Sequence, residues 1–247
     1  MKCGILVVGS LLWDAETVGR ADWRNERLEL EQQSSVTAPI YYGRKSNSRG
    51  GTFTMTFRRD GPSGLAIVVP CKRDIESIQD VMIEARALWK AEAPNSKSGA
   101  IASAWGSVGI LFGNNGARDL LAADWSCCFK NAGGKEFSVV TVDGQFDIAW
   151  PTNADGTPVE LDIILATATI PELDQPPVEA VADAWINQNG GYERYFIENV
   201  RNGIRTADDL GIWARIEKQA PTWLATADSY SEALMLLRTE TAESGAG

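Results

Sequence analysis

Hydrophobic residues in the first two-thirds of the chain come in short runs, each bounded by polar, glycine or proline residues. Residues 5–8 form a continuous run of Ile, Leu and Val, which is typical of a central strand buried on both faces. Other runs are rich in β-branched and aromatic residues, which favour strands. The pattern predicts strands at residues 5–8, 36–42, 52–57, 65–69, 107–112, 137–142, 146–150 and 161–169.

Helical periodicity appears in the middle of the chain and dominates after Pro177. Between Asp74 and Glu92, apolar residues recur at the three- and four-residue spacing of an amphipathic helix. The pattern predicts helices at residues 74–92, 117–129, 178–187, 192–202 and 222–238, followed by a small, polar, frayed end at 239–247.

The change from strands to helices suggests how the chain is organised. Residues 174–177 (Asp-Gln-Pro-Pro) are the best linker candidate, and they separate a strand-rich body, residues 1–173, from a helical segment, residues 174–247. The helical segment has few large apolar residues, so we expect it to pack on the body. The fold class predicted is α+β: a small mixed sheet with flanking helices and a C-terminal helical tail.

Composition and charge narrow the possible partners. The 247 residues are 44% hydrophobic and 23% charged, as expected of a globular chain that buries a large core. Lys and Arg number 23 against 33 Asp and Glu, a formal net charge of −10, which repels phosphate groups. We therefore expect no nucleic acid and no membrane partner, and favour a small molecule.

The absence of histidine restricts the chemistry further. With no His in the chain, Ser-His-Asp and Cys-His catalysis and histidine-ligated zinc are excluded, and a base must be a carboxylate, lysine, tyrosine or thiolate. The four cysteines form no C-x-x-C pair and predict free, buried thiols in a reducing cytosol. The apolar run near the N-terminus stops at Trp13 without a cleavage site, so we expect a cytoplasmic protein rather than a secreted one.

Glu92 differs from the other acidic residues of the 74–92 helix in its position around the helix axis. At about 100° per residue, the apolar side chains form one arc, and Glu92 falls inside it whereas Glu84 falls outside. A carboxylate on an apolar face loses hydration, which raises its pKa and makes it a better base. Glu92 is the candidate base; the alternatives are a solvated Glu92 where Ala93-Pro94 ends the helix, and Glu84 as the base.

A glycine turn and a basic loop supply candidate ligand-binding groups. Gly9 follows the first predicted strand, and the backbone N–H groups after such a turn can face an anion, although a simple turn is the alternative. The polar segment at 43–51 carries Arg44, Lys45 and Arg49. Arginine binds carboxylates in a bidentate manner, whereas a solvated hairpin tip is the alternative interpretation of this segment.

The start of the chain resembles the γ-glutamylcyclotransferase-like superfamily. Members of that family carry an aromatic-Gly-Ser-Leu motif at the end of the first strand, often followed by Trp. Gly9-Ser10-Leu11 and Trp13 match this motif, but Val8 stands where the family usually has Tyr or Phe.

Two later segments extend the resemblance. In the family, a strand ending near Pro leads into a helix that closes with Leu-x-x-x-Glu, and residues 65–70 and 88–92 are similar, with the glutamate about two turns later than in typical members. Residues 192–204 resemble the tyrosine-containing late helix of some members. The resemblance covers residues 1–112 and this late helix.

The resemblance implies a barrel-like α+β fold of five to seven strands and a cofactor-free, metal-free reaction. The α-amino group of a γ-glutamyl compound attacks its own γ-amide carbonyl, which yields 5-oxoproline and releases an amine or amino acid. Glu92 would be the general base, and the loop Val8, Gly9, Ser10 and Leu11 would hold the substrate. From the residues themselves, Arg44 or Arg49 is the candidate ligand for a substrate carboxylate.

Two other classes of function fit the same sequence. A non-catalytic binder of an amino-acid-like metabolite would retain the loop without turnover, and Glu92 would then be exposed or salt-bridged rather than lining the pocket. An interaction protein would use its acidic surface and nine Trp to contact a partner, but the Trp residues are spread along the chain, which favours core packing.

Overall fold

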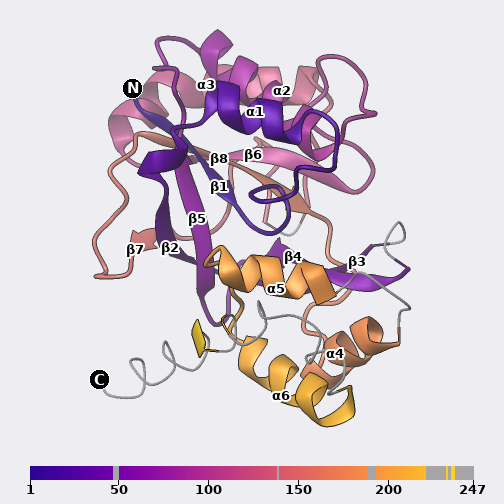
Figure 1. Ribbon diagram of the computed structural model, residues 1–247. Coiled ribbons are helices and arrows are strands. Elements are labelled where there is room, and N and C mark those ends of the chain that lie inside the picture. The colour runs from indigo at the N-terminus through magenta and orange to yellow at the C-terminus, as the bar shows by residue number, and fades with distance from the viewer. Residues whose placement is uncertain (47–49, 138, 188–192, 221–231, 233–234, 237–247) are drawn as a thin grey trace.

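A six-stranded mixed sheet forms the centre of the α+β fold in the computed structural model, which describes residues 1–46, 50–137, 139–187, 193–220, 232 and 235–236 (Figure 1). The strand order is β6-β8-β1-β5-β2-β7. The neighbours β1 and β8 run parallel, and the other pairs are antiparallel. The strands are β1 (Cys3–Val7), β2 (Ser34–Ala38), β5 (Gly64–Pro70), β6 (Gly106–Phe112), β7 (Thr152–Asn153) and β8 (Ile163–Thr169).

A separate two-stranded ribbon, β3 (Ile40–Ser46) and β4 (Thr52–Phe57), packs near one face of this sheet. The single strand predicted at 36–42 was wrong, because Pro39 cannot donate to a ladder and the chain passes there from the main sheet to the ribbon. The polar segment predicted as a loop from residue 43 was also wrong in part. Strand β3 continues to Ser46, so Arg44 lies on a strand.

The main sheet is open, which corrects the barrel-like sheet that the resemblance implied. Its edge strands, β6 and β7, stand at opposite ends of the order and do not pair with each other. Strand β7 is only 2 residues long, and the ribbon forms its ladder within itself rather than closing the sheet. In the part of the chain that the structure describes, the strands therefore do not form a closed barrel.

The predicted strands at 137–142 and 146–150 were wrong as well. Among the residues of these segments that the structure describes, pairing is limited to isolated bridges, such as Val140 with Phe146. Between them the backbone turns at Gly144, whose φ of 75° suits glycine, and the carbonyl of Gly144 accepts a hydrogen bond from Trp125 Nε1 at 3.1 Å. Val139, Val140 and Phe146 are buried here by turns and isolated bridges rather than by a ladder, whereas Val142 is exposed.

Helices cover the sheet on two sides (Figure 1). On one side lie α1 (Arg20–Arg27), α2 (Ile78–Glu92) and α3 (Asn115–Asn131); below the sheet, with the ribbon, lie α4 (Val178–Ile186), α5 (Glu193–Arg201) and α6 (Asp209–Gln219). Helices α1 and α6 and the short 3₁₀ turn Leu30–Gln32 were not predicted.

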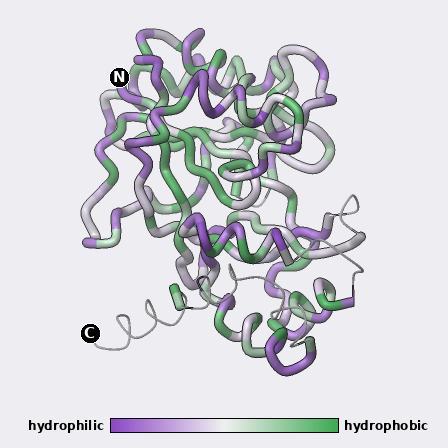
Figure 2. The backbone as a smooth tube through the Cα atoms, in the orientation of Figure 1, coloured by the Kyte–Doolittle hydropathy of each residue, from purple (hydrophilic) through white to green (hydrophobic). Residues whose placement is uncertain are grey.

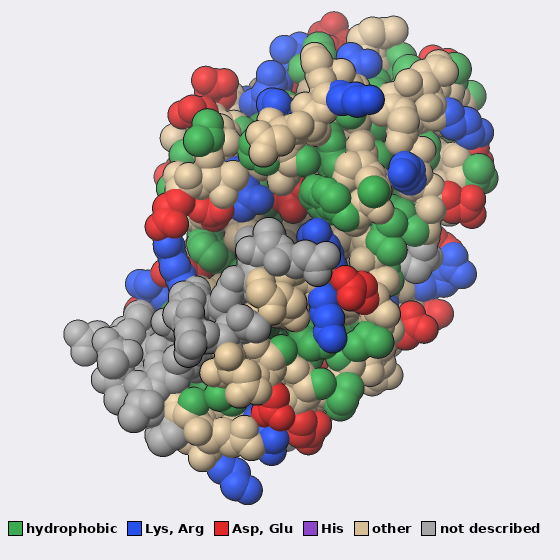
Figure 3. All heavy atoms as spheres, turned by 90° about the vertical axis from the view of Figure 1, so that its right-hand side faces the viewer, with side chains coloured by type: hydrophobic (Ala, Val, Ile, Leu, Met, Phe, Trp, Pro, Cys, Tyr) green, Lys and Arg blue, Asp and Glu red, His purple; other side chains and the backbone are tan. Residues whose placement is uncertain are grey.

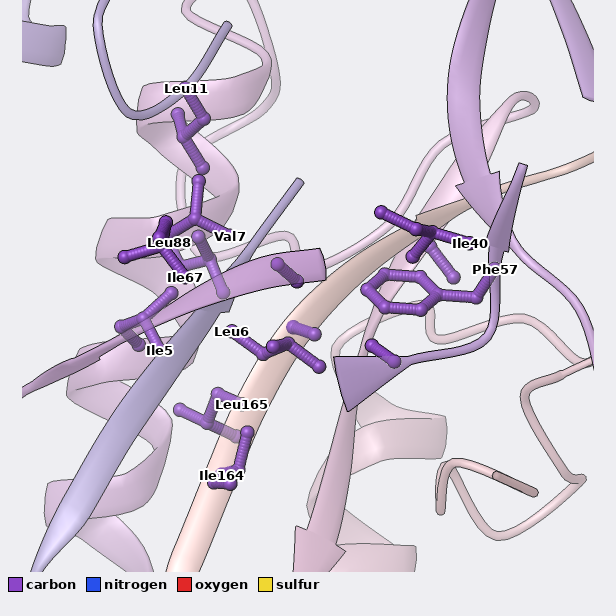
Figure 4. Packing of buried hydrophobic residues seen from close by; sticks show 14 of the residues in the cluster. Ile5, Leu6, Val7, Leu11, Ile40, Phe57, Ile67, Leu88, Ile164 and Leu165 are labelled. Carbon is purple, nitrogen blue, oxygen red and sulfur yellow. The ribbon is translucent and has the colours of Figure 1, made fainter. Parts of the chain in front are cut away.

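The continuous apolar run of β1 is buried on both faces, as predicted. Every residue of the strand is buried. Ile5 and Val7 lie toward Leu88 of α2, whereas Leu6 points to the other side, toward Phe57 of β4 (Figure 4). Hydrophobic positions concentrate in these central strands, and polar ones on the outer turns (Figure 2). Among the described segments, none of the helices has the length and apolar character needed to cross a membrane.

Helix α2 begins at a cap that the periodicity alone did not reveal. Ser77 accepts a hydrogen bond from the backbone N–H of Asp80, and the Asp80 carboxylate accepts one in return from the backbone N–H of Ser77, which together form a capping box. The helix therefore starts at Ile78 rather than Asp74. It ends at Glu92, as predicted, directly before the Ala93-Pro94 step.

The C-terminal helices contact the strands through large buried side chains. Trp185 of α4 donates from Nε1 to the carbonyl of Phe53 at 3.2 Å and stacks edge-on against Tyr42, with ring centroids 4.9 Å apart. The backbones of Leu65 and Arg205 exchange two hydrogen bonds of 2.8 Å. The division at residue 173 stays a prediction, and the helix predicted at 222–238 lies outside the described residues except for 232, 235 and 236.

Candidate functional site

A cavity of about 250 Å³ lies where the carboxyl ends of β1 and β8 meet the β3–β4 ribbon and the end of α2. The crevice outside the carboxyl ends of parallel strands is a usual place for a ligand. Its size suits a small metabolite. The side chains that line it include Val8, Ser10, Leu11, Arg20, Arg44, Glu92, Trp105 and Tyr195.

Most residues predicted from the sequence meet at this cavity. Glu92, Arg44 and the loop residues Val8, Ser10 and Leu11 all line it, although they come from β3, from α2 and from the end of β1. Gly9 lies between two lining residues. Arg49 falls outside the residues that the structure describes.

The loop after β1 is shaped by a glycine in a left-handed conformation. Gly9 has φ of 86°, and a Cβ at this position would lie 2.6 Å from Tyr195 Oη. The carbonyls of Gly9 and Ser10 accept from the backbone N–H groups of Leu12 at 3.3 Å and Asp14 at 2.8 Å. In the described part of the chain, the N–H groups of Gly9 and Leu11 donate no hydrogen bond. Such donors can bind the oxygen of a carbonyl or an anion.

Arg20 connects this loop to the end of α2. Its Nη1 donates to Ser10 Oγ at 3.1 Å and to Asp14 Oδ2 at 2.9 Å, and its Nε donates to the carbonyl of Ala91 at 3.1 Å. Its Nη2 lies 3.7 Å from Glu92 Oε2. The Arg20 side chain is 7% exposed and that of Glu92 is 20% exposed. One buried guanidinium group therefore holds the candidate base and the candidate oxygen-binding loop together.

The sequence reasoning missed Arg20, although a signal was available. Arg20, Trp23, Arg24 and Arg27 recur at the spacing of one helix face, and the structure places them on α1. A predominantly basic face is usually a solvated one, which hides its importance in a sequence. Here Arg20, Trp23 and Arg24 are buried because α1 packs against α2.

Asp14 and Arg24 complete the support of the loop. Arg24 Nη1 donates to the carbonyls of Leu11 and Asp14, both at 2.9 Å. Burial opposes ionisation of Asp14, but hydrogen bonds from Thr17 and from the backbone of Glu16, together with Arg20, hold its pKa below the ordinary value. Asp14 is thus a stable anion beside the two arginines.

Arg44 reaches the cavity over an aromatic stack. Its guanidinium carbon lies 4.6 Å from the ring centroid of Trp105, which in turn stacks on Trp89 with centroids 4.9 Å apart. Trp89 is fully buried in α2. A cation on an indole face is attracted by the ring, so this stack holds the Arg44 side chain at the cavity wall.

Helix α5 closes the site from the C-terminal part of the chain. Trp13 donates from Nε1 to Asn199 Oδ1 at 2.8 Å, and its ring meets that of Tyr195 at a centroid distance of 6.2 Å. Tyr195 Oη accepts from the backbone N–H of Met55 at 3.2 Å. These contacts place Tyr195 between the Gly9 loop and β4.

Glu84, the alternative base, lies elsewhere. Its side chain is 2% exposed and pairs with Arg27 at 3.0 Å and Arg73 at 3.4 Å, in a surface hollow separate from the cavity. Burial raises its pKa, and the two arginines oppose that rise. The helical arc placed Glu84 outside the apolar face, and it is nevertheless buried because α1 brings Arg27 over it. It does not line the cavity at the Gly9 loop.

In the part of the chain that the structure describes, the thiols and the acidic residues form no metal centre. The cysteines are free, and only Cys3 is fully buried, whereas Cys127 is exposed, which corrects the expectation that they are all buried. Within the described ranges, no cluster of three or more Cys, Asp or Glu could hold a metal ion.

Comparisons of the chain with protein-family models, with curated proteins and with solved structures find no match.

Proposed function

We propose that the chain is a γ-glutamylcyclotransferase-like enzyme, which converts a γ-glutamyl compound to 5-oxoproline and releases an amine or amino acid. The observation that carries the proposal is the meeting of Glu92 with the Gly9–Leu11 loop at one cavity. A base and a set of oxygen-binding donors must face the same small substrate, and here they come from opposite ends of the first hundred residues.

The reaction needs few groups, and the cavity has candidates for each. Glu92 takes a proton from the substrate α-ammonium, and the free amine then attacks the γ-carbonyl carbon. Negative charge develops on the carbonyl oxygen, where the N–H groups of Gly9 and Leu11 can stabilise it. The C–N bond to the leaving amine breaks as protonated Glu92 returns its proton to that nitrogen. The ring nitrogen then passes its remaining extra proton to the regenerated Glu92 carboxylate and on to the released amine, which leaves as an ammonium ion. Because the nucleophile is part of the substrate, the enzyme mainly selects a folded conformer.

The proposal includes a relationship of fold. The chain keeps the order that the resemblance requires: a first strand β1, the Gly-Ser-Leu loop, the strand β5 that ends at Pro70, and helix α2 that ends at Glu92. On this proposal the open sheet and the β3–β4 ribbon are a divergent form of the family's barrel-like arrangement. Arg44 is the candidate ligand for a carboxylate on the substrate.

A non-catalytic binder of an amino-acid-like metabolite is the second candidate. The ion pair between Arg20 and Glu92 favours it, because a salt-bridged Glu92 is what the non-catalytic binder predicts. Val8, in place of the family's aromatic residue, favours it too. In a binder the same loop, Glu92 and arginines would hold the ligand without turnover.

The decisive experiment compares wild type with Glu92→Gln on a panel of γ-glutamyl compounds, with 5-oxoproline release as the readout. We expect the variant to lose activity by at least about 100-fold, because general-base catalysis contributes roughly 10²- to 10⁴-fold. Circular dichroism checks that the variant folds.

Glu84→Gln is the control, since Glu84 lies on the same helix but away from the cavity. It should keep the kcat of the wild type even if its stability falls. Activity that survives in Glu92→Gln and disappears in Glu84→Gln would reverse the assignment of the base. If no compound releases 5-oxoproline but some bind, the non-catalytic candidate replaces the enzyme.

A further inference from the structure

We infer that Arg20 and Glu92 together form a subsite for the free α-carboxylate and α-ammonium of an amino acid, so that ligands with a blocked α-carboxyl group are rejected. The inference deepens the proposed function and rests on it for the reaction, but its subsite can be tested by binding alone. It assigns the carboxylate to a buried arginine of α1 rather than to Arg44 or Arg49.

One nitrogen of Arg20 makes an ion pair but no hydrogen bond to any residue that the structure describes. Nε and Nη1 donate hydrogen bonds to Ala91, Ser10 and Asp14. Nη2 donates none to any residue that the structure describes, and its distance of 3.7 Å to Glu92 Oε2 is longer than the usual 2.7–2.9 Å of a charge-assisted hydrogen bond. A cation whose Nη2 donates no hydrogen bond within the described residues and a carboxylate thus stand side by side at the cavity wall.

An α-amino acid is complementary to this pair, because its carboxylate and ammonium groups are attached to the same carbon. A carboxylate on Arg20 Nη2 would leave the ammonium against Glu92. Arg20 is 7% exposed, so its attraction for an anion is only weakly screened by water. The same placement would bring the proton that must be removed to the group proposed as the base.

The charges of the site also favour a zwitterionic ligand whose carboxylate lies beside Arg20. Among the described residues that line the cavity, Arg20 and Arg44 are cationic and Glu92 is anionic. Behind them, Arg24 and Asp14 are linked through the Asp14 carbonyl, and Asp14 also pairs with Arg20. An ammonium group that neutralises Glu92 therefore leaves an excess of positive charge for the carboxylate.

Arg20 and Arg44 lie at different parts of the cavity wall, which indicates different roles for them. Arg20 is the arginine beside Glu92, whereas the Arg44 guanidinium lies over the Trp105 ring. We therefore expect Arg44 and Trp105 to contact the part of the substrate beyond the glutamyl head, and Arg20 to contact the head itself.

The test uses two probes, a γ-glutamyl anilide with a free α-carboxylate and the same anilide with an α-carboxamide. Release of 5-oxoproline gives kcat/KM, and calorimetry gives Kd, for wild type, Arg20→Gln and Arg44→Gln. Wild type should prefer the carboxylate by at least about 10-fold, the effect of one charge-assisted hydrogen bond. Arg20→Gln should bring both probes to the same level, and Arg44→Gln should keep the preference.

Arg20 is buried and holds the loop, so Arg20→Lys is a second variant that keeps the charge without the planar fork. It should reduce the preference while circular dichroism shows an intact fold. The comparison of the two probes on wild type needs no variant at all.

Each result decides the inference. Equal use and binding of both probes by wild type, or loss of the preference in Arg44→Gln but not in Arg20→Gln, would overturn it while leaving the cyclotransferase proposal in place. A preference seen in binding without turnover would support the subsite and reject the enzyme. If neither probe binds or reacts, both proposals fail.

Discussion

At the scale of single residues, Gly9 meets two separate demands that no other residue type satisfies. Its φ of 86° lies in the left-handed region, and the space where a Cβ would stand is filled by Tyr195 Oη at 2.6 Å. The turn after β1 requires the left-handed conformation, and the close approach of Tyr195 on α5 requires the absence of a Cβ. Both fix the direction of the N–H groups that the proposed reaction needs.

Gly9→Ala should therefore lower both stability and activity. The left-handed conformation alone costs a residue with a Cβ about 1–2 kcal/mol, and displacement of Tyr195 adds to that. We expect a loss of more than about 2 kcal/mol in urea denaturation and at least about a 10-fold loss of 5-oxoproline release.

Gly19→Ala is the matched control. Gly19 has φ of 84°, but no atom lies within 4 Å of the position of its Cβ. Its substitution should show the conformational cost alone and keep the activity. Equal losses in the two variants would mean that the contact with Tyr195 contributes nothing.

At the scale of elements, the start of α6 contains a buried acid. Asp209 is 1% exposed, and Thr206 donates to its Oδ1 at 2.5 Å. Burial raises the pKa of Asp209 to about 7, although Thr206, Arg205 and Tyr42 oppose the rise. Burial also raises the pKa of Tyr42, on β3, and Asp209 adds to this rise. The docking of α6 against the ribbon therefore depends on a carboxyl group that titrates near neutral pH.

The sign of the effect on stability follows from linkage. The folded-state pKa of Asp209 is above the unfolded value, so the folded state binds more protons between about pH 4 and pH 7. Its contribution to stability is complete below that range and is lost as the pH rises through about 7. The free energy of unfolding should fall by up to about 1.4 kcal/mol per pH unit across this range.

Urea denaturation at pH 5, 6, 7 and 8 measures this slope. Asp209→Asn should flatten it, whereas Asp208→Asn, one residue earlier at the helix cap, should leave it as in wild type. An unchanged slope in Asp209→Asn would assign the pH dependence to another group.

At the scale of the whole molecule, the helical segment after residue 173 shares the core of the strands. Trp185 packs on Tyr42, Phe196 packs between Trp185 and Trp213 with centroid distances of 5.5 and 6.3 Å, and Asn199 holds Trp13. Figure 3 shows basic and acidic side chains interspersed over one face of the molecule, with hydrophobic side chains between them. Buried aromatic contacts and hydrogen bonds connect the segment to the body, and the exposed ion pair of Arg194 with Glu16 adds to them.

A fragment of residues 1–173 should consequently lose the cooperative fold, because Tyr42 and the loop after β1 would lose their partners. Near-ultraviolet circular dichroism and thermal denaturation measure this loss. A fragment of residues 1–220 keeps the contacts of Trp185, Phe196, Asn199 and Trp213 and should unfold cooperatively. A stable, cooperative 1–173 fragment would show that the body is an independent domain.

The elements that the sequence could predict are those whose signal is local. A run buried on both faces predicted β1, and apolar spacing predicted α2 and its end at Glu92, because burial of each side chain follows from its own position in a regular element. The glycine turn was readable for the same reason. The switch of the chain between two sheets at Pro39 depends on distant pairing, and so do the bridges at 137–146, which the strand pattern did not reveal.

The candidate site, like the fold, has residues that the local sequence predicted and residues that only the packing of distant elements brought together. Helix phase selected Glu92, which lines the cavity, but it did not predict that Glu84 is the more buried of the two, with 2% of its side chain exposed against 20% for Glu92. The loop Gly9-Ser10-Leu11 was visible as a turn after a strand. Arg20 became a candidate only when α1 packed on α2 and buried its basic face, and Glu84 became a buried partner of Arg27 through the same contact. Local periodicity determines which way a side chain leaves its own element. Which cation it meets there depends on how elements far apart in the chain pack, and only the tertiary structure decides that.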